Sequence, residues 1–70
     1  MRRQRVSSSS LISVGYDGSS RTLELEFAGG AVYRYRKVPR LVYDELMRAP
    51  SKGRFVNAFV RDTFPFSRID

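Results

Sequence analysis

The stretch Tyr33-Arg34-Tyr35-Arg36-Lys37-Val38-Pro39 decides the fold, because the spacing of the apolar residues changes at its end. On its N-terminal side apolar and polar residues alternate, which is typical of strands with one buried face. On its C-terminal side apolar residues recur at every third or fourth position, which is typical of amphipathic helices. The sequence therefore predicts strands followed by helices, with no helix before residue 38.

Three segments in the first half of the chain have the strand pattern, and they predict strands at residues 11–17, 22–28 and 31–37. Asp17-Gly18-Ser19-Ser20 separates the first two strands, because Asp and Ser bond to nearby backbone and Gly accepts positive φ. Gly29-Gly30 separates the second and third. Since short turns join antiparallel neighbours, the three strands are expected to form a meander.

The turn at residues 28–30 sets the register between the second and third strands. A three-residue turn places Leu25 opposite Tyr33 and keeps the apolar side chains on one face. It also places Glu24 opposite Arg34 on the other face. A two-residue turn would pair Leu25 with Arg34 and bring cations into the core, so we predict the three-residue turn.

Two helices are predicted, at residues 39–49 and 51–62. Pro39 suits the first turn of a helix, where its missing N–H would have no partner. Pro50 ends the first helix, and Ser51 is a good N-cap for the second. The predicted fold is α+β: a three-stranded antiparallel meander followed by two helices packed on one face.

Residues 6–70 are expected to form a single domain, in which the tail from Thr63 packs irregularly over the core. Residues 1–5 contain three arginines and are predicted to be a flexible basic arm. A chain of 70 residues has a thin core, so a homo-oligomer stays an open alternative to a monomer.

The composition argues against an enzyme. The sequence has no Cys and no His, which removes disulfides, the commonest metal ligand and the commonest general base. It also lacks a Gly-rich phosphate loop and a nucleophile elbow. We therefore expect no catalysis, no cofactor and no bound metal. No apolar run reaches the ~20 residues that span a bilayer, and no signal-peptide pattern is present, so we expect a cytoplasmic protein.

The net charge of +6 predicts a negatively charged partner. We interpret the chain as a small basic module that binds RNA or other nucleic acid through phosphate contacts. The alternative is a protein–protein interaction or self-association module that meets an acidic protein partner. No membrane partner is expected.

Two tyrosines and two cations on the third strand are candidates for contact with nucleic acid. Tyr33 and Tyr35 either stack on bases, as aromatic residues on RNA-binding sheets do, or pack against the leucines of the neighbouring strand. The predicted register favours packing. Arg36 and Lys37 have no acid opposite them and are candidates for phosphate contact.

The start of the second helix, Ser51-Lys52-Gly53-Arg54, is the best anion-site candidate. A helix N-terminus presents free N–H groups, and the glycine would allow a phosphate to approach the backbone. Asn57 and Arg61 lie farther along the same face. The alternative is a capped helix start with a solvated face. Reversing the charges of Lys52 and Arg54 to Glu should weaken RNA binding without unfolding the protein, since both side chains are expected to point into solvent.

Several short segments occur in an order that is similar to one known family. They are Val6-Ser7-Ser8, Val14-Gly15-Tyr16-Asp17, Leu23-Glu24-Leu25-Glu26-Phe27, Tyr33-Arg34-Tyr35, Val38-Pro39, Val42-Tyr43 and Ser51-Lys52-Gly53-Arg54-Phe55, with Asn57 and Arg61. From about Val6 to Pro65 the chain resembles the KTSC domain, found at the C-terminus of some lysyl-tRNA synthetases and as stand-alone bacterial or phage proteins. The resemblance implies no established activity, and RNA binding is suggested for the family from its domain context. Val56 and Phe59 depart from the expected pattern, and an exposed Phe59 would indicate a partner surface.

Overall fold

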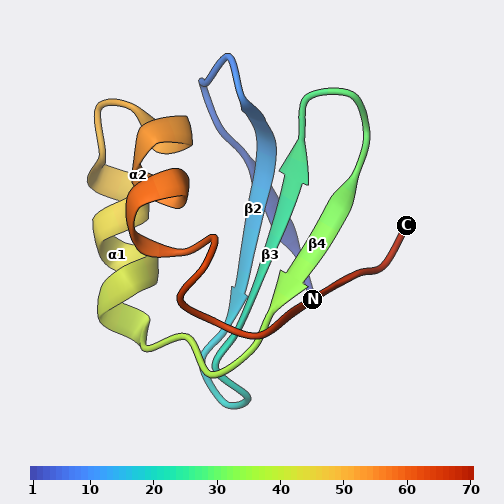
Figure 1. Cartoon of the computed structure of the whole chain (residues 1–70), viewed down its shortest axis with the longest axis vertical. Helices are drawn as coiled ribbons and strands as arrows, with labels where there is room; N and C mark the ends of the chain where they lie inside the picture. Colours follow the sequence, from blue (N-terminus) through green and yellow to red (C-terminus); the bar gives the residue numbers. More distant parts are fainter.

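The computed structural model describes residues 1–70 and consists of an antiparallel sheet with two helices on one face (Figure 1). The five strands lie side by side in the order of the chain, so the sheet is a simple meander. The elements are β1 (Arg3–Arg5), β2 (Leu11–Asp17), β3 (Thr22–Phe27), β4 (Val32–Tyr35), α1 (Arg40–Arg48), α2 (Lys52–Phe59) and β5 (Phe66–Arg68). The predicted α+β class and the absence of a helix before residue 38 are confirmed. Neither helix is long and apolar enough to cross a membrane.

The predicted register between β3 and β4 is confirmed. Leu25 pairs with Tyr33, and Glu24 pairs with Arg34. The connection closes through a hydrogen bond of 2.8 Å from the Phe27 N–H to the Ala31 carbonyl. The turn needs glycine, because Gly29 and Gly30 both have φ of +102°, a conformation that side chains disfavour.

The structure differs from the prediction of a flexible basic arm at residues 1–5. Arg3–Arg5 forms the edge strand β1, with Arg3 opposite Gly15 of β2. The Arg3 guanidinium forms a 2.7 Å ion pair with Glu24 and donates a 3.1 Å hydrogen bond to Ser13. A side chain at position 15 would approach the Arg3 stem to 2.9 Å, so this glycine permits the close contact.

The C-terminal tail also differs from the prediction. Phe66–Arg68 forms β5 against β4, with Phe66 opposite Tyr35, in place of irregular packing. Edge strands of three residues are too short to show alternation in sequence, and their pairing is set by the strand beside them. The three predicted strands therefore lie at the centre of a sheet that is wider than expected.

Both helices are shorter than predicted. Pro39 occupies the N-cap position of α1, one residue before the helix begins. The second helix ends at Phe59, and the Arg61 N–H bonds to the Val56 carbonyl at 2.9 Å as the chain turns away. This turn carries the chain from the helix layer back to β5.

The core lies between the sheet and the helices. Tyr35, Leu23 and Leu25 on the sheet pack against Leu46 of α1 and Val56 of α2. The whole cluster consists of Leu11, Val14, Leu23, Leu25, Tyr35, Val38, Leu46, Val56 and Val60. All nine side chains are almost fully buried, so their packing supplies the main favourable term in folding.

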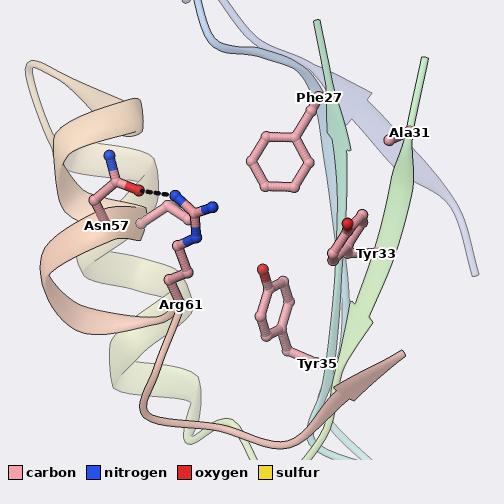
Figure 2. A pocket seen from close by; sticks show the side chains of 7 residues that line it. Phe27, Ala31, Tyr33, Tyr35, Asn57 and Arg61 are labelled. Carbon is pink, nitrogen blue, oxygen red and sulfur yellow. Dashed lines mark hydrogen bonds between the residues drawn. The ribbon is translucent and has the colours of Figure 1, made fainter. Parts of the chain in front are cut away.

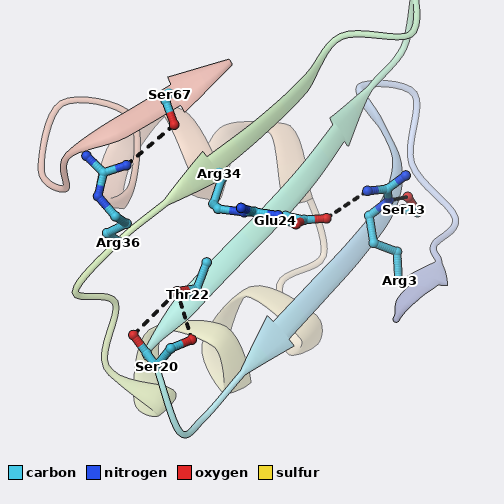
Figure 3. A network of polar contacts seen from close by, with 8 residues as sticks. All are labelled: Arg3, Ser13, Ser20, Thr22, Glu24, Arg34, Arg36 and Ser67. Atoms are coloured by element: carbon cyan, nitrogen blue, oxygen red, sulfur yellow. Dashed lines mark hydrogen bonds and ion pairs between the residues drawn. The ribbon is translucent and has the colours of Figure 1, made fainter. Parts of the chain in front are cut away.

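The face of the sheet away from the helices has a polar network (Figure 3). Glu24 lies at its centre, 3% exposed, and accepts charged hydrogen bonds from Arg3 on one side and Arg34 on the other. Ser13 donates a 2.8 Å hydrogen bond to Glu26 in the same network. These contacts link β1, β2, β3 and β4 across the open face.

Candidate nucleic-acid interface

A pocket of about 220 Å³ lies between α2 and the strands β3 and β4 (Figure 2). It forms where the helix layer and the sheet do not fully close on one another. The residues that line it are Phe27, Ala31, Tyr33, Tyr35, Val56, Asn57 and Arg61. Four of these, the two tyrosines, the asparagine and the arginine, are among the ten predicted site residues.

The sheet wall of the pocket is aromatic. Tyr33 meets Phe27 edge to face at 5.6 Å and stacks on Phe66 at 5.6 Å. Tyr35 also contacts Phe66, at 5.5 Å between ring centroids. Tyr35 packs in the core, and Tyr33, which is half-buried, also presents a ring to the pocket. That either ring stacks on a base stays a prediction.

The Tyr35 hydroxyl points into this pocket (Figure 2). The residue is 2% exposed, yet its hydroxyl has no hydrogen bond to the protein. Since every side-chain polar atom that is sealed from solvent has a partner, this hydroxyl opens onto the pocket. Burial raises the pKa of Tyr35, although the positive charge of Arg61 lowers it in part. The hydroxyl is therefore protonated at neutral pH and can donate a hydrogen bond.

The helix wall of the pocket is polar. Asn57 and Arg61 are one turn apart, and the Arg61 Nη1 donates a 3.2 Å hydrogen bond to the Asn57 Oδ1. Arg61 has no ion pair with any acid of the protein, so most of its N–H groups stay free. Because the asparagine oxygen already accepts from the guanidinium, its NH₂ group is left to donate to a ligand.

The first turn of α2 differs from the predicted phosphate site at two residues. Lys52 does not point into solvent, because its Nζ donates to the carbonyls of Met47 at 3.3 Å and Ala49 at 3.2 Å at the end of α1. The Ser10 side chain packs against Gly53, and its Oγ would lie only 2.5 Å from a Cβ added at position 53. The space next to this glycine is therefore filled by the protein itself.

The remaining residues of that turn match the capped helix start. The Ser51 hydroxyl accepts a hydrogen bond of 3.4 Å from the Arg54 N–H, which confirms the predicted N-cap. The Arg54 side chain is exposed and has no acidic partner. That this turn binds phosphate stays a prediction, with Arg54 as its free cation.

Replacing Lys52 with Met is expected to lower the free energy of unfolding by about 1–2 kcal/mol, because the last carbonyls of α1 lose a charged donor. Arg54→Met removes a cation of the same helix turn that has no such contact, and it should leave the stability within about 0.5 kcal/mol of the parent. Urea titrations of the two variants measure the difference. Equal midpoints would show that Lys52 contributes only charge.

Arg36 and Lys37 lie apart from the pocket. Arg36 follows the alternation of β4 onto the open face of the sheet, where its Nη1 is 3.4 Å from the Ser67 hydroxyl (Figure 3). Lys37 is exposed and has φ of 62°, which ends the strand before the predicted residue 37. The structure thus separates these two cations from the tyrosines that precede them in sequence.

The sequence prediction missed Phe27 and Ala31 as pocket residues. Both lie on the core side of the turn between β3 and β4, and the Phe27 N–H bonds to the Ala31 carbonyl. A small residue opposite a large aromatic one in the predicted register was the available signal, because it leaves space beside the ring.

A second surface lies on the other side of the helix layer. Leu41 and Phe59 are 65% and 58% exposed and line a shallow groove between α1 and α2. Phe55 packs against Phe59 at 4.9 Å along the same groove. The sequence analysis took an exposed Phe59 as the sign of a partner surface, and Phe59 is exposed.

Comparison with known proteins shows the family. The KTSC domain family matches residues 7–64. An uncharacterised protein of Stutzerimonas stutzeri is 45% identical over the full length of both chains, and a protein of Tsukamurella paurometabola is 48% identical over 87% of this chain and 91% of its own. A lysine–tRNA ligase of Trichormus variabilis is 41% identical over 77% of this chain, which is 10% of the ligase.

A solved structure is similar over almost the whole chain. The crystal structure of a KTSC domain protein from Yersinia pestis has a TM-score of 0.93 and 40% sequence identity, and it covers 99% of this chain and 97% of its own. The match therefore includes the short edge strands as well as the central sheet. This chain belongs to the KTSC domain family.

Proposed function

We propose that this protein binds RNA or another nucleic acid in single-stranded form, along α2 and into the pocket between α2 and β4. The observation that carries the proposal is that the Arg61 guanidinium, which has no ion pair within the protein, lies next to the aromatic wall of the pocket. Proteins that bind single strands combine these two features, because bases stack on aromatic rings while cations contact the phosphates.

The cations on α2 and in the turn after it support this assignment. Arg54 and Asn57 are three residues apart on α2, and Arg61, in the turn that follows the helix, donates a 3.2 Å hydrogen bond to Asn57. Both arginines are exposed and free of internal acids. By contrast, Arg3 and Arg34 are paired with Glu24, and their charge is partly used within the protein. A strand that follows α2 would therefore meet two available cations before it reaches the pocket.

The relatives give separate support for an RNA partner. A segment similar to this chain occurs within lysine–tRNA ligases, enzymes that are named for a transfer RNA. The net charge of +6 favours the same class of partner.

Arg61→Glu is expected to weaken binding of a short single-stranded RNA by roughly tenfold at low salt and to lower the slope of log K against log salt by about one. The physical reason is the loss of one phosphate contact and the introduction of a repelling charge at the rim of the pocket. Fluorescence anisotropy at several salt concentrations measures both quantities.

Arg40→Glu is the matched control, because it changes the net charge equally at the start of α1, where an acidic residue suits the helix dipole. It should leave the affinity within about twofold of the parent. Equal losses in the two variants would show that only overall charge matters. No binding of single-stranded or structured RNA by the parent protein at low salt would remove the nucleic-acid function.

The alternative function is contact with a protein, either an acidic partner or a second copy of this chain. The exposed Leu41 and Phe59 along the helix groove favour it, since large apolar side chains at a surface often mark protein contacts. Sedimentation at rising concentration would detect a second copy, and retained RNA binding by Phe59→Ser would separate the two surfaces.

A further inference from the structure

We infer that Phe66, on the edge strand β5, is the residue on which a base of the bound single strand stacks. This inference rests on the proposed function and adds the stacking residue to it. Three observations support the assignment: the face of the sheet on which Phe66 lies, the exposure of its ring and the charge of Arg61 nearby.

Phe66 lies on the same face of the sheet as the aromatic wall of the pocket. It pairs with Tyr35, and side chains directly opposite one another on paired strands share a face. The centroid of its ring is 5.6 Å from that of Tyr33 and 5.5 Å from that of Tyr35. Phe66 therefore continues the aromatic wall from β3 and β4 to the edge of the sheet.

Phe66 is the most exposed of these aromatic residues. Tyr35 is 2% exposed, and Tyr33 is half-buried. Phe27 and Phe66 contact Tyr33 from opposite sides, because β4 lies between β3 and β5 in the sheet. Phe66 is 49% exposed although both tyrosines pack against it, and no strand covers the outer side of β5. The part of its ring that is turned away from the tyrosines is therefore open to a ligand.

An exposed ring that is held in place by other rings suits a nucleic-acid base. Every base has a flat π-face, so stacking on an aromatic side chain stabilises a bound single strand whatever its sequence. The Phe66 ring already stacks on Tyr33 with an angle of 21° between the planes. Because this contact fixes the ring before the ligand arrives, binding orders few further side-chain rotamers.

Arg61 supplies a cation close to this ring. It lines the pocket together with Tyr35, whose ring contacts Phe66. Arg61 lowers the pKa of Tyr35 more than the neighbouring Asp62 raises it, so the positive charge dominates at this tyrosine. A nucleotide with its phosphate at Arg61 would extend its base across Tyr35 toward Phe66. A cation beside an exposed ring favours a nucleotide over an apolar side chain as the ligand.

Phe66→Leu is expected to weaken binding of a short oligouridine about tenfold and to leave the slope of log K against log salt unchanged, because a stack is lost and the phosphate contacts remain. Leucine keeps apolar packing on the tyrosines, so the melting temperature should stay close to that of the parent. Fluorescence anisotropy at several salt concentrations measures the affinity and the slope. An abasic oligomer of the same length should bind the parent and the variant equally, since it has no base to stack.

Phe59→Leu is the matched control, because it makes the same change at a ring that is 58% exposed in the groove between α1 and α2. It should leave the oligouridine affinity within about twofold of the parent. Equal affinities of the Phe66→Leu variant, the Phe59→Leu variant and the parent would overturn the inference and leave the proposed function in place.

Phe66→Trp reports on stacking directly, because the chain contains no other tryptophan. Oligouridine should quench the fluorescence of this variant and leave that of Phe59→Trp unchanged. Binding of the oligomer, seen by anisotropy, with no change in the fluorescence of Phe66→Trp would overturn the inference alone and leave Phe66 as a contact for a protein partner. No binding of the oligomer by the parent or by either variant would reject the proposed function together with the inference.

Discussion

Leu25→Ala is expected to lower the free energy of unfolding by about 2–5 kcal/mol and the melting temperature by roughly 10–25 °C. Leu25 lies on β3, the central strand, and its side chain is completely buried in the core cluster. Strands pair with β3 on both edges and the helices cover this face, so the structure cannot collapse into the space that the substitution leaves. The cost therefore combines lost transfer free energy with a residual cavity.

Leu41→Ala removes the same atoms from a side chain that is 65% exposed and serves as the control. It should change the free energy of unfolding by less than about 0.5 kcal/mol. If Leu25→Ala does not fold well enough for a urea titration, Leu25→Val gives a smaller loss of about 1 kcal/mol. Similar midpoints for the position 25 variants and Leu41→Ala would contradict the packing described here.

Glu24→Gln is expected to destabilise the protein by about 1–3 kcal/mol, because charged hydrogen bonds with two arginines are lost. The Glu24 carboxylate is 2.7 Å from Arg3 and 2.6 Å from Arg34, and its side chain is 4% exposed. Since the arginine side chains are 32% and 44% exposed, water can solvate them in part after the substitution. The loss should therefore be smaller than that of a fully buried ion pair.

The same carboxylate makes the stability depend on pH. Burial raises the pKa of Glu24, but the hydrogen bonds and positive charges of Arg34 and Arg3 outweigh burial and hold the pKa below its usual value of 4.5. The stabilisation from Glu24 is therefore fully present above the pKa of the unfolded chain and is lost as the pH falls through the lower pKa of the folded protein. Urea midpoints measured from neutral to acidic pH should fall for the parent and fall less for Glu24→Gln.

Glu45→Gln is the control for this effect. Its 3.4 Å ion pair with Arg48 is exposed on α1, and such pairs contribute little to stability. The variant should follow the pH dependence of the parent. If the urea midpoints of Glu24→Gln fall with pH as much as those of the parent, the pH dependence of stability comes from other carboxylates.

The central strands and their register could be predicted because their information is local. Leu23, Leu25 and Phe27 alternate with acidic residues, and the glycine turn allows one register that keeps the core face apolar. The N-cap at Ser51 was predictable for the same reason, since a cap depends on residues within one turn. The prediction that Tyr33 and Tyr35 face the helices followed directly from the register.

The edge strands were not predictable from local pattern. Arg3 is ordered by an acid 21 residues away in sequence, and Phe66 pairs with a strand that precedes both helices. Neither segment has the alternating apolar residues that identify a strand by itself. Their pairing depends on the exposed edges that β2 and β4 provide after the central sheet has formed.

The sequence alone therefore determined the order of strands and helices, the register of β3 with β4 and the face on which the tyrosines lie, because these follow from periodicity and turn chemistry between near neighbours. Only the tertiary structure decided which predicted site residues lie together. Packing of α2 against β4 brings Asn57 and Arg61 to Tyr33 and Tyr35, while it commits Lys52 to the end of α1 and Gly53 to Ser10. These contacts join residues far apart in the chain, and their distances depend on how the two layers settle on the core.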